Sequence, residues 1–272
     1  MKSNSIKTIV ILLLISIIFI FINTVSNTRV KKLKGPPTTH TRRSNTIPKI
    51  VFQTYKSYDK VPVNVKNNIK QYAKEYQYKF YSDKACYNFI KNNYSSSILN
   101  VYKHLRGAHR ADLVRYCLLY KYGGIYIDIK TELIKPLKDI FTKNYTYTCI
   151  CWTRIAGRCI YQGIIATTKG NPLFLKLIKF IEKTHKDSNK NYHIYTEDFF
   201  NNIKKLLPVN NNIKEGLNIT KRPSDDNIYL FQELCDHNPD NCYDGLDRYG
   251  LCCHVYDKGE KIFKTRYSSY PW

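Results

Sequence analysis

Four charged residues in one stretch of the chain could form a binding site for a polar ligand. Asp112 and Arg115 lie three positions apart, and Asp128 and Lys130 lie two positions apart. Carboxylates accept hydrogen bonds and bind cations, whereas guanidinium and ammonium groups only donate and favour anions. These side chains can act together only if the fold holds them in one place, and the residues between them indicate how it does so.

The residues around the first pair predict an amphipathic helix. Ala111, Val114 and Leu118 fall on one apolar stripe, so this face of the helix can pack against a sheet. At a spacing of three residues, Asp112 and Arg115 are neighbours on the helix surface.

A two-glycine stop and a short strand follow this helix. Gly123-Gly124 ends the helix, because glycine adopts the left-handed conformation after a helix without steric cost. In residues 125–130, isoleucine then alternates with tyrosine, aspartate and lysine, which is the period of a strand. Asp128 and Lys130 therefore leave the sheet on the same side, at the strand end where open α/β sheets bind ligands. Taken singly, the helical pair could be a surface ion pair, and Asp128 a turn residue.

This stretch resembles the sugar-binding region of glycosyltransferase family 32, whose pattern is approximately R-A-D-x-x-R-Y-x-x-L-x-x-x-G-G-x-Y-x-D-x-D. The resemblance extends from the first strand, Ile47 to Thr54, to the segments Tyr161 to Ala166 and Gly170 to Pro172, so it covers about residues 47–172. The residues that match the central pattern are Arg110, Ala111, Asp112, Arg115, Tyr116, Leu119, Gly123, Gly124, Tyr126 and Asp128.

One departure from the family pattern affects its chemistry. The second aspartate of D-x-D is Lys130 in this chain, and an ammonium group cannot bind a cation. Lys130 could itself pair with the donor diphosphate as a point charge, so that Mn²⁺ or Mg²⁺ is optional. Alternatively, a carboxylate elsewhere, near the C-terminus, could complete a weaker metal site with Asp128, or the protein could be catalytically inactive.

The resemblance implies a role for each matching residue. The transferred sugar would be bound by Asp112 and Arg115, and the nucleotide ribose or a metal ion by Asp128. The catalytic residues that the resemblance implies are Asp112, Arg115, Asp128 and Lys130. The implied nucleotide-sugar-binding residues are Gln53, Thr54, Gly124 and Tyr126. The implied metal ligand is Asp128.

The fold expected from the resemblance is α/β, of GT-A type. It would have a Rossmann-like, mostly parallel sheet with flanking helices and a small C-terminal lobe. Local patterns predict helices near 65–76, 83–90, 173–184 and 197–207, a loop over 208–227 and a hairpin after 256. The expected division is a head at 1–7, an anchor at 8–25, a stalk at 26–46, a catalytic core at 47–207 and a cysteine-rich acceptor-side lobe at 208–272.

The N-terminus predicts a membrane segment. Residues 9–22 are apolar except for Ser16, within the softer stretch 8–25. Eighteen helical residues span about 27 Å, which suits a thin bilayer. A cleaved signal peptide has the same layout. The basic residues after the segment favour a cytosolic domain by the positive-inside rule. The resemblance and three glycosylation sequons, at Asn93, Asn144 and Asn218, favour the type II orientation in the secretory-pathway lumen, which we expect.

Charge and cysteines limit the function classes. The net charge is +23, of which residues 1–43 contribute eight positive charges and no negative charge. Such a chain could attract polyanions, but it has no nucleic-acid-binding motif, and we expect no nucleic-acid partner. All nine cysteines follow the apolar segment, and those near the C-terminus lack zinc-knuckle spacing, so disulfides explain them better than a metal.

The sequence therefore favours a membrane-anchored, retaining hexosyltransferase. It would use a UDP- or GDP-sugar and a glycan or glycoprotein acceptor. Two alternatives stay open: an inactive nucleotide-sugar- or glycan-binding relative, and a basic, membrane-tethered protein that binds polyanions.

Overall fold

The computed structural model describes residues 43–151, 159–209, 211–222, 225–236 and 252–265. The expected head, anchor and most of the stalk lie outside these residues. Within them, no helix has the length and apolarity that a bilayer-spanning segment needs.

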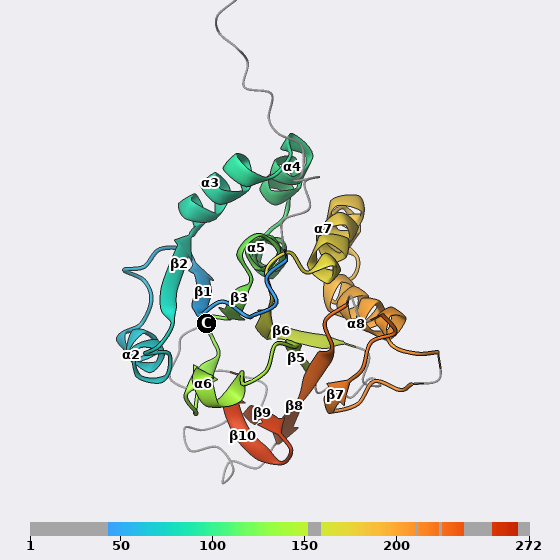
Figure 1. Ribbon diagram of the computed structural model, residues 1–272. Coiled ribbons are helices and arrows are strands. Elements are labelled where there is room, and N and C mark those ends of the chain that lie inside the picture. Colours follow the sequence, from blue (N-terminus) through green and yellow to red (C-terminus); the bar gives the residue numbers. More distant parts are fainter. Residues whose placement is uncertain (1–42, 152–158, 210, 223–224, 237–251, 266–272) are drawn as a thin grey trace, which may run out of the picture. The chain divides into compact units, whose positions relative to one another are not determined.

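One sheet holds ten strands of the described chain, in the order β2-β1-β3-β6-β5-β8-β9-β10-β4, with β7 paired to β8 (Figure 1). The strands are β1 Ile50–Tyr55, β2 Gln77–Ser82, β3 Gly124–Ile127, β4 Glu132–Leu133, β5 Thr146–Ile150, β6 Ile160–Thr167, β7 Gly216–Asn218, β8 Ile228–Asp236, β9 Cys252–Asp257 and β10 Glu260–Lys264.

The expectation of a mostly parallel sheet is wrong, because the sheet is mixed. β1 is parallel to β2 and β3, and β5 is parallel to β8. β6 lies antiparallel between β3 and β5, and the strands after β8 pair antiparallel. Two reversals at β6 leave β5 and β8 pointing the same way as β1, β2 and β3. The C-terminal ends of these five strands therefore still share one edge.

The sheet also curls, so that β4, at one end of the strand order, lies close to β3. Five strands separate β3 from β4 in that order, yet only residues 128–131 join them in the sequence. Asp128 is the first residue of this short connection. It is held there by its backbone N–H, which donates to the carbonyl of Gly163 at 2.7 Å, and by its carbonyl, which accepts from Thr131 at 2.9 Å.

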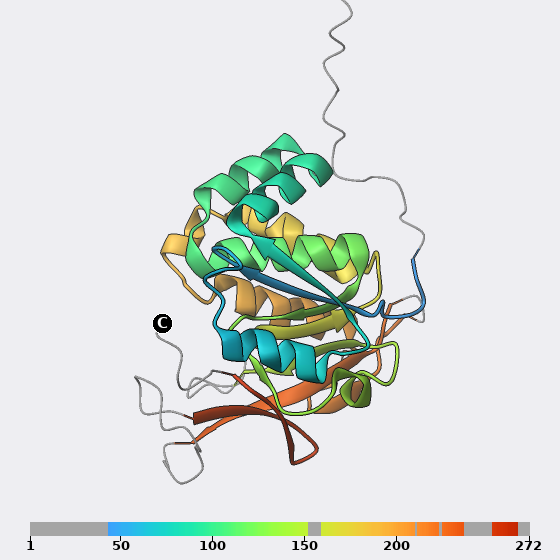
Figure 2. The same ribbon diagram turned by 90° about the vertical axis from the view of Figure 1, so that its left-hand side faces the viewer.

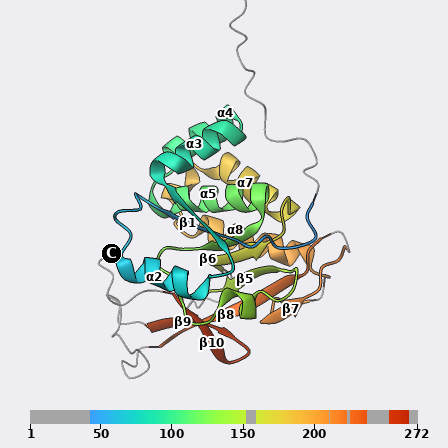
Figure 3. The ribbon, with the colours of Figure 1, turned by 60° about the vertical axis from the view of Figure 1, so that its left-hand side comes forward.

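Helices cover both faces of the sheet (Figure 3). Alternate side chains of β1 and β3 enter two cores, as strand geometry requires. Phe52 and Tyr126 pack with the helices α3, α4, α5, α7 and α8, whereas Val51 and Ile125 pack on the face of α2 and α6. The helices are α2 Val63–Tyr72, α3 Asp83–Asn93, α4 Ser96–His104, α5 Gly107–Tyr122, α6 Leu137–Ile140, α7 Pro172–Thr184 and α8 Ile194–Leu206.

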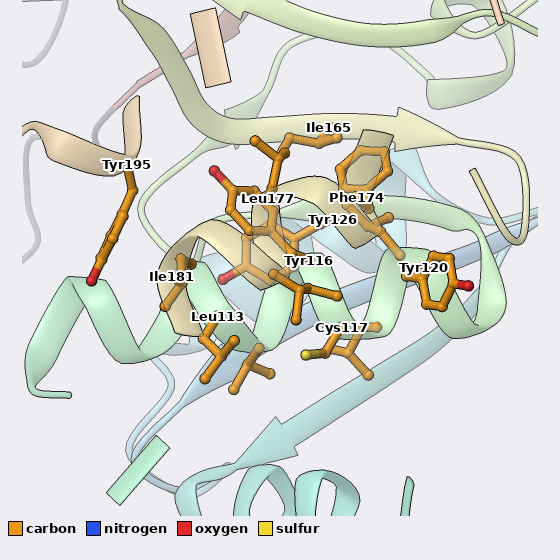
Figure 4. Packing of buried hydrophobic residues seen from close by; sticks show 14 of the residues in the cluster. Leu113, Tyr116, Cys117, Tyr120, Tyr126, Ile165, Phe174, Leu177, Ile181 and Tyr195 are labelled. Carbon is orange, nitrogen blue, oxygen red and sulfur yellow. The ribbon is translucent and has the colours of Figure 1, made fainter. Parts of the chain in front are cut away.

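The central helix, α5, is buried nearly all round, which corrects the expectation of an amphipathic helix. Val114 and Leu118 are buried as predicted, but so is every residue from Asp112 to Tyr120. Figure 4 shows Leu113, Tyr116 and Cys117 of α5 among side chains of α7 and β6. Other helices, seen beside α5 in Figure 2, cover the face that the sequence left to solvent. Asp112 and Arg115 are therefore interior residues rather than surface neighbours.

Several local predictions are confirmed, and the helices predicted near 83–90 and 173–184 are α3 and α7. Ser82 caps α3 by accepting from the Ala85 N–H at 3.2 Å, and Asn171 caps α7 by accepting from the Leu173 N–H at 3.0 Å. The predicted hairpin is β9–β10, and its turn places Lys258 and Gly259 at positive φ.

Other elements differ from the sequence prediction. The predicted loop over 208–227 contains β7, and α4, β5 and β8 were not predicted. In the described residues, the strands after 208 continue the sheet of the core, so the expected C-terminal lobe is an extension of that sheet. Strand pairing depends on contacts between residues far apart in the sequence, so the hydrophobic pattern of one strand does not predict which strand it pairs with.

Candidate functional site

Two glycines fix the connection between α5 and β3. Gly123 and Gly124 have φ values of +67° and +98°, and neither position has room for a side chain. A Cβ on Gly123 would lie 2.5 Å from the backbone N of Lys169, and a Cβ on Gly124 would lie 2.8 Å from the carbonyl of Ile50. The absence of a side chain at Gly124 therefore allows β1 to lie close to the start of β3. The chain reverses directly between helix and strand, and an earlier residue of α5, Arg115, reaches the far end of β3, where Asp128 follows.

Strand alternation then turns Asp128 toward α5. Tyr126 faces the α5 side of the sheet, so Asp128, two residues later, leaves on the same side. Arg115 meets it there: Arg115 Nη2 is 3.8 Å from Asp128 Oδ2 and 3.4 Å from Asp112 Oδ1. The structure therefore brings the three residues together, with the guanidinium between two carboxylates.

The three side chains differ in how far solvent reaches them. The Asp128 side chain is 31% exposed, whereas that of Arg115 is only 5% exposed. The guanidinium is further held by its Nη1, which donates to the Gln162 carbonyl at 2.5 Å, and by the Tyr126 ring, whose centroid is 4.7 Å away. A ligand can therefore reach Asp128 directly, while Arg115 acts first as a fixed charge beneath it.

Burial and charge act in opposite directions on this cluster. Burial raises the pKa of Asp112, while the nearby Arg115 and His109 lower it, with a net upward shift. Burial lowers the pKa of Arg115, but Tyr126 and the two carboxylates raise it by more. The guanidinium therefore remains charged, and it attracts both carboxyl groups in a region with little water.

Gln53 and Thr54 lie at the same sheet edge but on opposite faces of β1. Thr54 Oγ1 is 2.9 Å from the Tyr126 hydroxyl, on the α5 side. Gln53 is fully buried, its Oε1 accepts from the Tyr78 hydroxyl at 3.1 Å, and its Nε2 lies 3.5 Å from the Asp128 carbonyl. Gln53 thus supports the connection that carries Asp128.

Lys130 lies in the connection after β3, two residues beyond Asp128, and is half-buried. Its backbone position follows from the turn that Thr131 closes on the Asp128 carbonyl. Of the seven other residues implied at the site, six lie on α5 or toward the C-terminal ends of β1 and β3. Gly124 instead begins β3 and lies beside Ile50, at the opposite end of the strand.

Gln162 is a polar residue of the site to which the sequence assigned no role. It is 4% exposed on β6, and with its amide nitrogen facing α5 it donates to Asp112 Oδ1 at 2.7 Å. Its only sequence signal is its place in the segment Tyr161 to Ala166, which resembles a family strand.

A divalent cation fits this site only in part. In the described residues, the one group of three His, Cys, Asp or Glu side chains close enough to hold a metal is Glu233, Cys235 and Cys253. Cys235 and Cys253 form a disulfide, so that group is not a metal centre. Asp128 offers one carboxylate, and Mg²⁺ sites of this kind take their other ligands from phosphate and water.

The predicted disulfides are confirmed in part. Cys235–Cys253 joins β8 to β9, and a second disulfide links Cys151 to Cys159. Cys117 is a free, buried thiol. Cys242, the remaining cysteine of the C-terminal group besides Cys252, lies outside the described residues.

Comparison with known proteins supports the resemblance. Residues 59–147 match the family model described as "Glycosyltransferase sugar-binding region containing DXD motif". This range contains Asp112, Arg115, Asp128 and Lys130. The resemblance to family 32 drawn from the sequence is thereby confirmed for the part of the chain that holds the charged cluster.

Individual proteins similar to this chain include yeast mannosyltransferases. Inositol phosphoceramide mannosyltransferase 3 of Schizosaccharomyces pombe is 28% identical over 144 residues, which are 52% of this chain and 38% of that protein. A mannosyl phosphorylinositol ceramide synthase of Saccharomyces cerevisiae is 32% identical over 139 residues, 50% of this chain and 35% of that protein. The chain thus spans little more than a third of the length of these yeast relatives.

Two further matches come from other sources. An uncharacterised glycosyltransferase of Acanthamoeba polyphaga mimivirus is 28% identical over 138 residues, 49% of this chain and 55% of that protein. The solved structure of the PaToxG glycosyltransferase superposes on 60% of this chain and 71% of its own, with a TM-score of 0.43 and 17% identity.

Proposed function

Because residues 59–147 match a DXD-type glycosyltransferase sugar-binding region, we propose that this chain transfers a hexose from a nucleotide sugar to a glycan, glycoprotein or lipid acceptor, with retention of anomeric configuration. The lipid class that the names of the yeast relatives favour is inositol phosphoceramide. The same names favour mannose as the transferred sugar.

The observation that carries this proposal is the position of Arg115 between Asp112 and Asp128. A sugar offers hydroxyl donors, and two carboxylates held in a fixed geometry can accept from them without reorganisation. Asp112 would accept from a hydroxyl of the transferred sugar, and Asp128, the more exposed carboxylate, from the ribose. Holding both halves of the donor in this way orients the anomeric carbon toward the acceptor.

The leaving nucleoside diphosphate develops negative charge that the site must stabilise. Lys130, in the connection after Asp128, supplies an ammonium group for this purpose. A Mn²⁺ or Mg²⁺ ion bound by Asp128 and the two phosphates would supply further positive charge at the same place. In a front-face reaction, the leaving phosphate oxygen takes the proton of the acceptor hydroxyl.

The proposal includes a membrane anchor at residues 8–25 and a lumenal catalytic domain. Two disulfides within the fold support an oxidising compartment, because cytosolic thiols are kept reduced. Of the three sequons, Asn218 is buried at 4% exposure, so it is closed to modification in the folded protein, whereas Asn144 is exposed.

A second candidate function follows from Lys130. If the lysine replaces an essential metal ligand, the chain binds nucleotide sugars without transferring them. Such a protein would retain the Asp112–Arg115–Asp128 cluster, and so would keep donor affinity without turnover.

A thermal-shift series on the detergent-solubilised full chain tests the proposal. We would add UDP or GDP, with Mn²⁺ or with EDTA, and then assay release of the nucleoside diphosphate from UDP-glucose and GDP-mannose. A ligand at a hundred times its dissociation constant stabilises a protein by about 2.7 kcal/mol. A shift with one nucleotide and release of its sugar support the transferase. A shift without sugar release supports the inactive relative, and no shift with either nucleotide contradicts both.

A further inference from the structure

Gln162 connects three elements at the sugar end of the proposed site. Its backbone carbonyl accepts from Arg115 Nη1, while its side chain bridges α5 and α8. The amide nitrogen donates to Asp112 Oδ1 at 2.7 Å, and the amide oxygen accepts from the Thr196 N–H at 3.2 Å. The Tyr116 hydroxyl lies 2.9 Å from the amide oxygen and 3.1 Å from the nitrogen.

The orientation of this amide is fixed by the start of α8. Thr196 is the third residue of that helix, where backbone N–H groups have no partner within the helix. The N-cap residue, His193, makes no side-chain capping bond. The Thr196 N–H can only donate, so it selects the oxygen of Gln162. The nitrogen must then face Asp112, whose carboxylate can only accept when it is ionised.

This orientation determines what Asp112 can offer a ligand. Oδ1 receives the Gln162 amide and lies 3.4 Å from Arg115 Nη2. The carboxyl group is therefore held against rotation by contacts on Oδ1, and it is left with acceptor capacity on Oδ2. We infer that Gln162 is a positioning residue, which holds Asp112 so that it accepts a hydroxyl group of the donor sugar, and links that contact to the first turn of α8.

The inference rests on the proposed function and adds a role that the sequence pattern did not assign. A purely structural Gln162 would support the fold and affect every ligand equally. A positioning Gln162 instead affects the sugar half of the donor and leaves the nucleotide half unchanged. The contrast between a nucleoside diphosphate and its sugar ester therefore separates the two roles.

Two variants of the full chain make this contrast. Gln162→Met removes the amide but keeps the length of the side chain. Gln162→Glu keeps the oxygen that Thr196 needs and replaces the donor by a carboxyl group. Gln77→Glu, an exposed residue at the start of β2, is the matched control for the charge change.

Binding is measured by calorimetry with UDP, UDP-glucose, GDP and GDP-mannose at pH 8. At that pH we expect both variants to bind the nucleoside diphosphate as the wild type does. The dissociation constant of its sugar ester should rise roughly ten- to a hundredfold, because a hydrogen bond to a buried charged group is lost. Gln77→Glu should match the wild type for all four ligands.

A pH series provides a readout that a structural role would not give. In Gln162→Glu two buried carboxyl groups adjoin, so one of them is protonated well above its ordinary pKa. The O–H of the introduced carboxyl group, once protonated, then donates to Asp112 as the amide did. Sugar affinity in Gln162→Glu should recover as the pH falls from 8 to 5, while Gln162→Met stays weak throughout.

Other charged or titratable groups also face Asp112. They are His109 and Arg115 on α5, and Asp128 after β3, with Tyr116 of α5 and Tyr195 of α8 close by. All of them are present in the wild type and in both variants. Their protonation therefore cancels when each variant is compared with the wild type at the same pH.

The outcomes distinguish this inference from the proposed function. A wild type that binds none of the four ligands contradicts the proposed function, and the inference falls with it. A wild type that binds, with variants that keep its sugar affinity, overturns the inference alone. Equal weakening of nucleoside diphosphate and sugar ester in both variants also overturns it, since Gln162 would then support the fold only.

Discussion

Arg115 of α5 and Asp128 at the end of β3 form an ion pair across the candidate site, with Nη2 of the arginine 3.8 Å from Oδ2 of the aspartate. The pair joins a buried helix to the exposed edge of the sheet. Because the same nitrogen also reaches Asp112, one guanidinium sets the spacing of the two carboxylates that we propose bind the two halves of the donor.

Removing this guanidinium should destabilise the fold in a pH-dependent way. Arg115→Met leaves Asp112 buried without its cation, and breaking a buried pair costs about 3–5 kcal/mol. Burial already raises the pKa of Asp112, and the substitution raises it further. A group whose pKa is raised in the folded state contributes stability at low pH, and this stability is lost as the pH rises. The loss of unfolding free energy in Arg115→Met should therefore be larger at pH 8 than at pH 5. Urea denaturation at both pH values measures it. Arg115→Lys, which keeps the charge, should lie between, and an equal Arg115→Met deficit at both pH values would contradict the pairing.

Asp128 and Lys130 should affect activity rather than folding. Asp128→Ala removes a partly exposed carboxylate and should lower turnover about a hundredfold, while Arg115 keeps Asp112 as its partner. Lys130→Asp restores a second carboxylate and should make donor binding dependent on Mn²⁺. Nucleotide-sugar turnover and calorimetry with Mn²⁺ or EDTA check both effects. Lys143→Asp, at an exposed position between α6 and β5, controls for the charge change. An Asp128→Ala enzyme as active as the wild type would remove Asp128 from the site.

The glycine at the end of α5 should be indispensable for steric reasons. Gly123→Ala combines a positive φ with a Cβ only 2.5 Å from the backbone of Lys169, and should cost about 3 kcal/mol. Gly216→Ala is the matched control, since its φ is +84° and no atom lies within 4 Å of the added Cβ. It should cost about 1 kcal/mol. Chemical denaturation measures the free energy of unfolding, and equal losses would show that the contact with Lys169 does not matter.

A buried acid on α8 should lower stability above neutral pH. Burial raises the pKa of Asp198 to about 6, against the attraction of Lys205. Its folded pKa is thus above the unfolded value, so the stability present at low pH is lost as pH rises through about 6. Asp198→Asn should match the wild type near pH 4 and exceed it at pH 8. Because the residue borders a surface groove of about 640 Å³, water reduces the expected gain to about 1–2 kcal/mol.

The measurement for Asp198 is thermal unfolding between pH 4 and pH 8. Glu197→Gln serves as control, since Glu197 is the adjacent, exposed acid of the same helix. A gain of equal size for both substitutions would point to net charge rather than to burial of Asp198.

The sequence alone determined the local frame of the site. The apolar spacing before Gly123, the two glycines and the alternation after them predicted a helix, a sharp stop and a strand that ends at Asp128. These features depend on backbone preferences and on the spacing of apolar side chains over a few residues, so they can be predicted without the rest of the chain. The same holds for the helices that begin after Ser82 and after Asn171.

Tertiary structure decided the direction of the strands and what is buried. β6 reverses the sheet, and other helices cover the second face of α5, so Asp112 and Arg115 became interior residues. Gln162 reaches Asp112 from fifty positions further along the chain, and its amide is oriented by Thr196 on α8. Local sequence patterns do not predict such contacts, because the contacts depend on which surfaces, far apart in the sequence, pack together. The sequence therefore placed the carboxylates on their elements, and only the packed fold decided how each carboxylate is held.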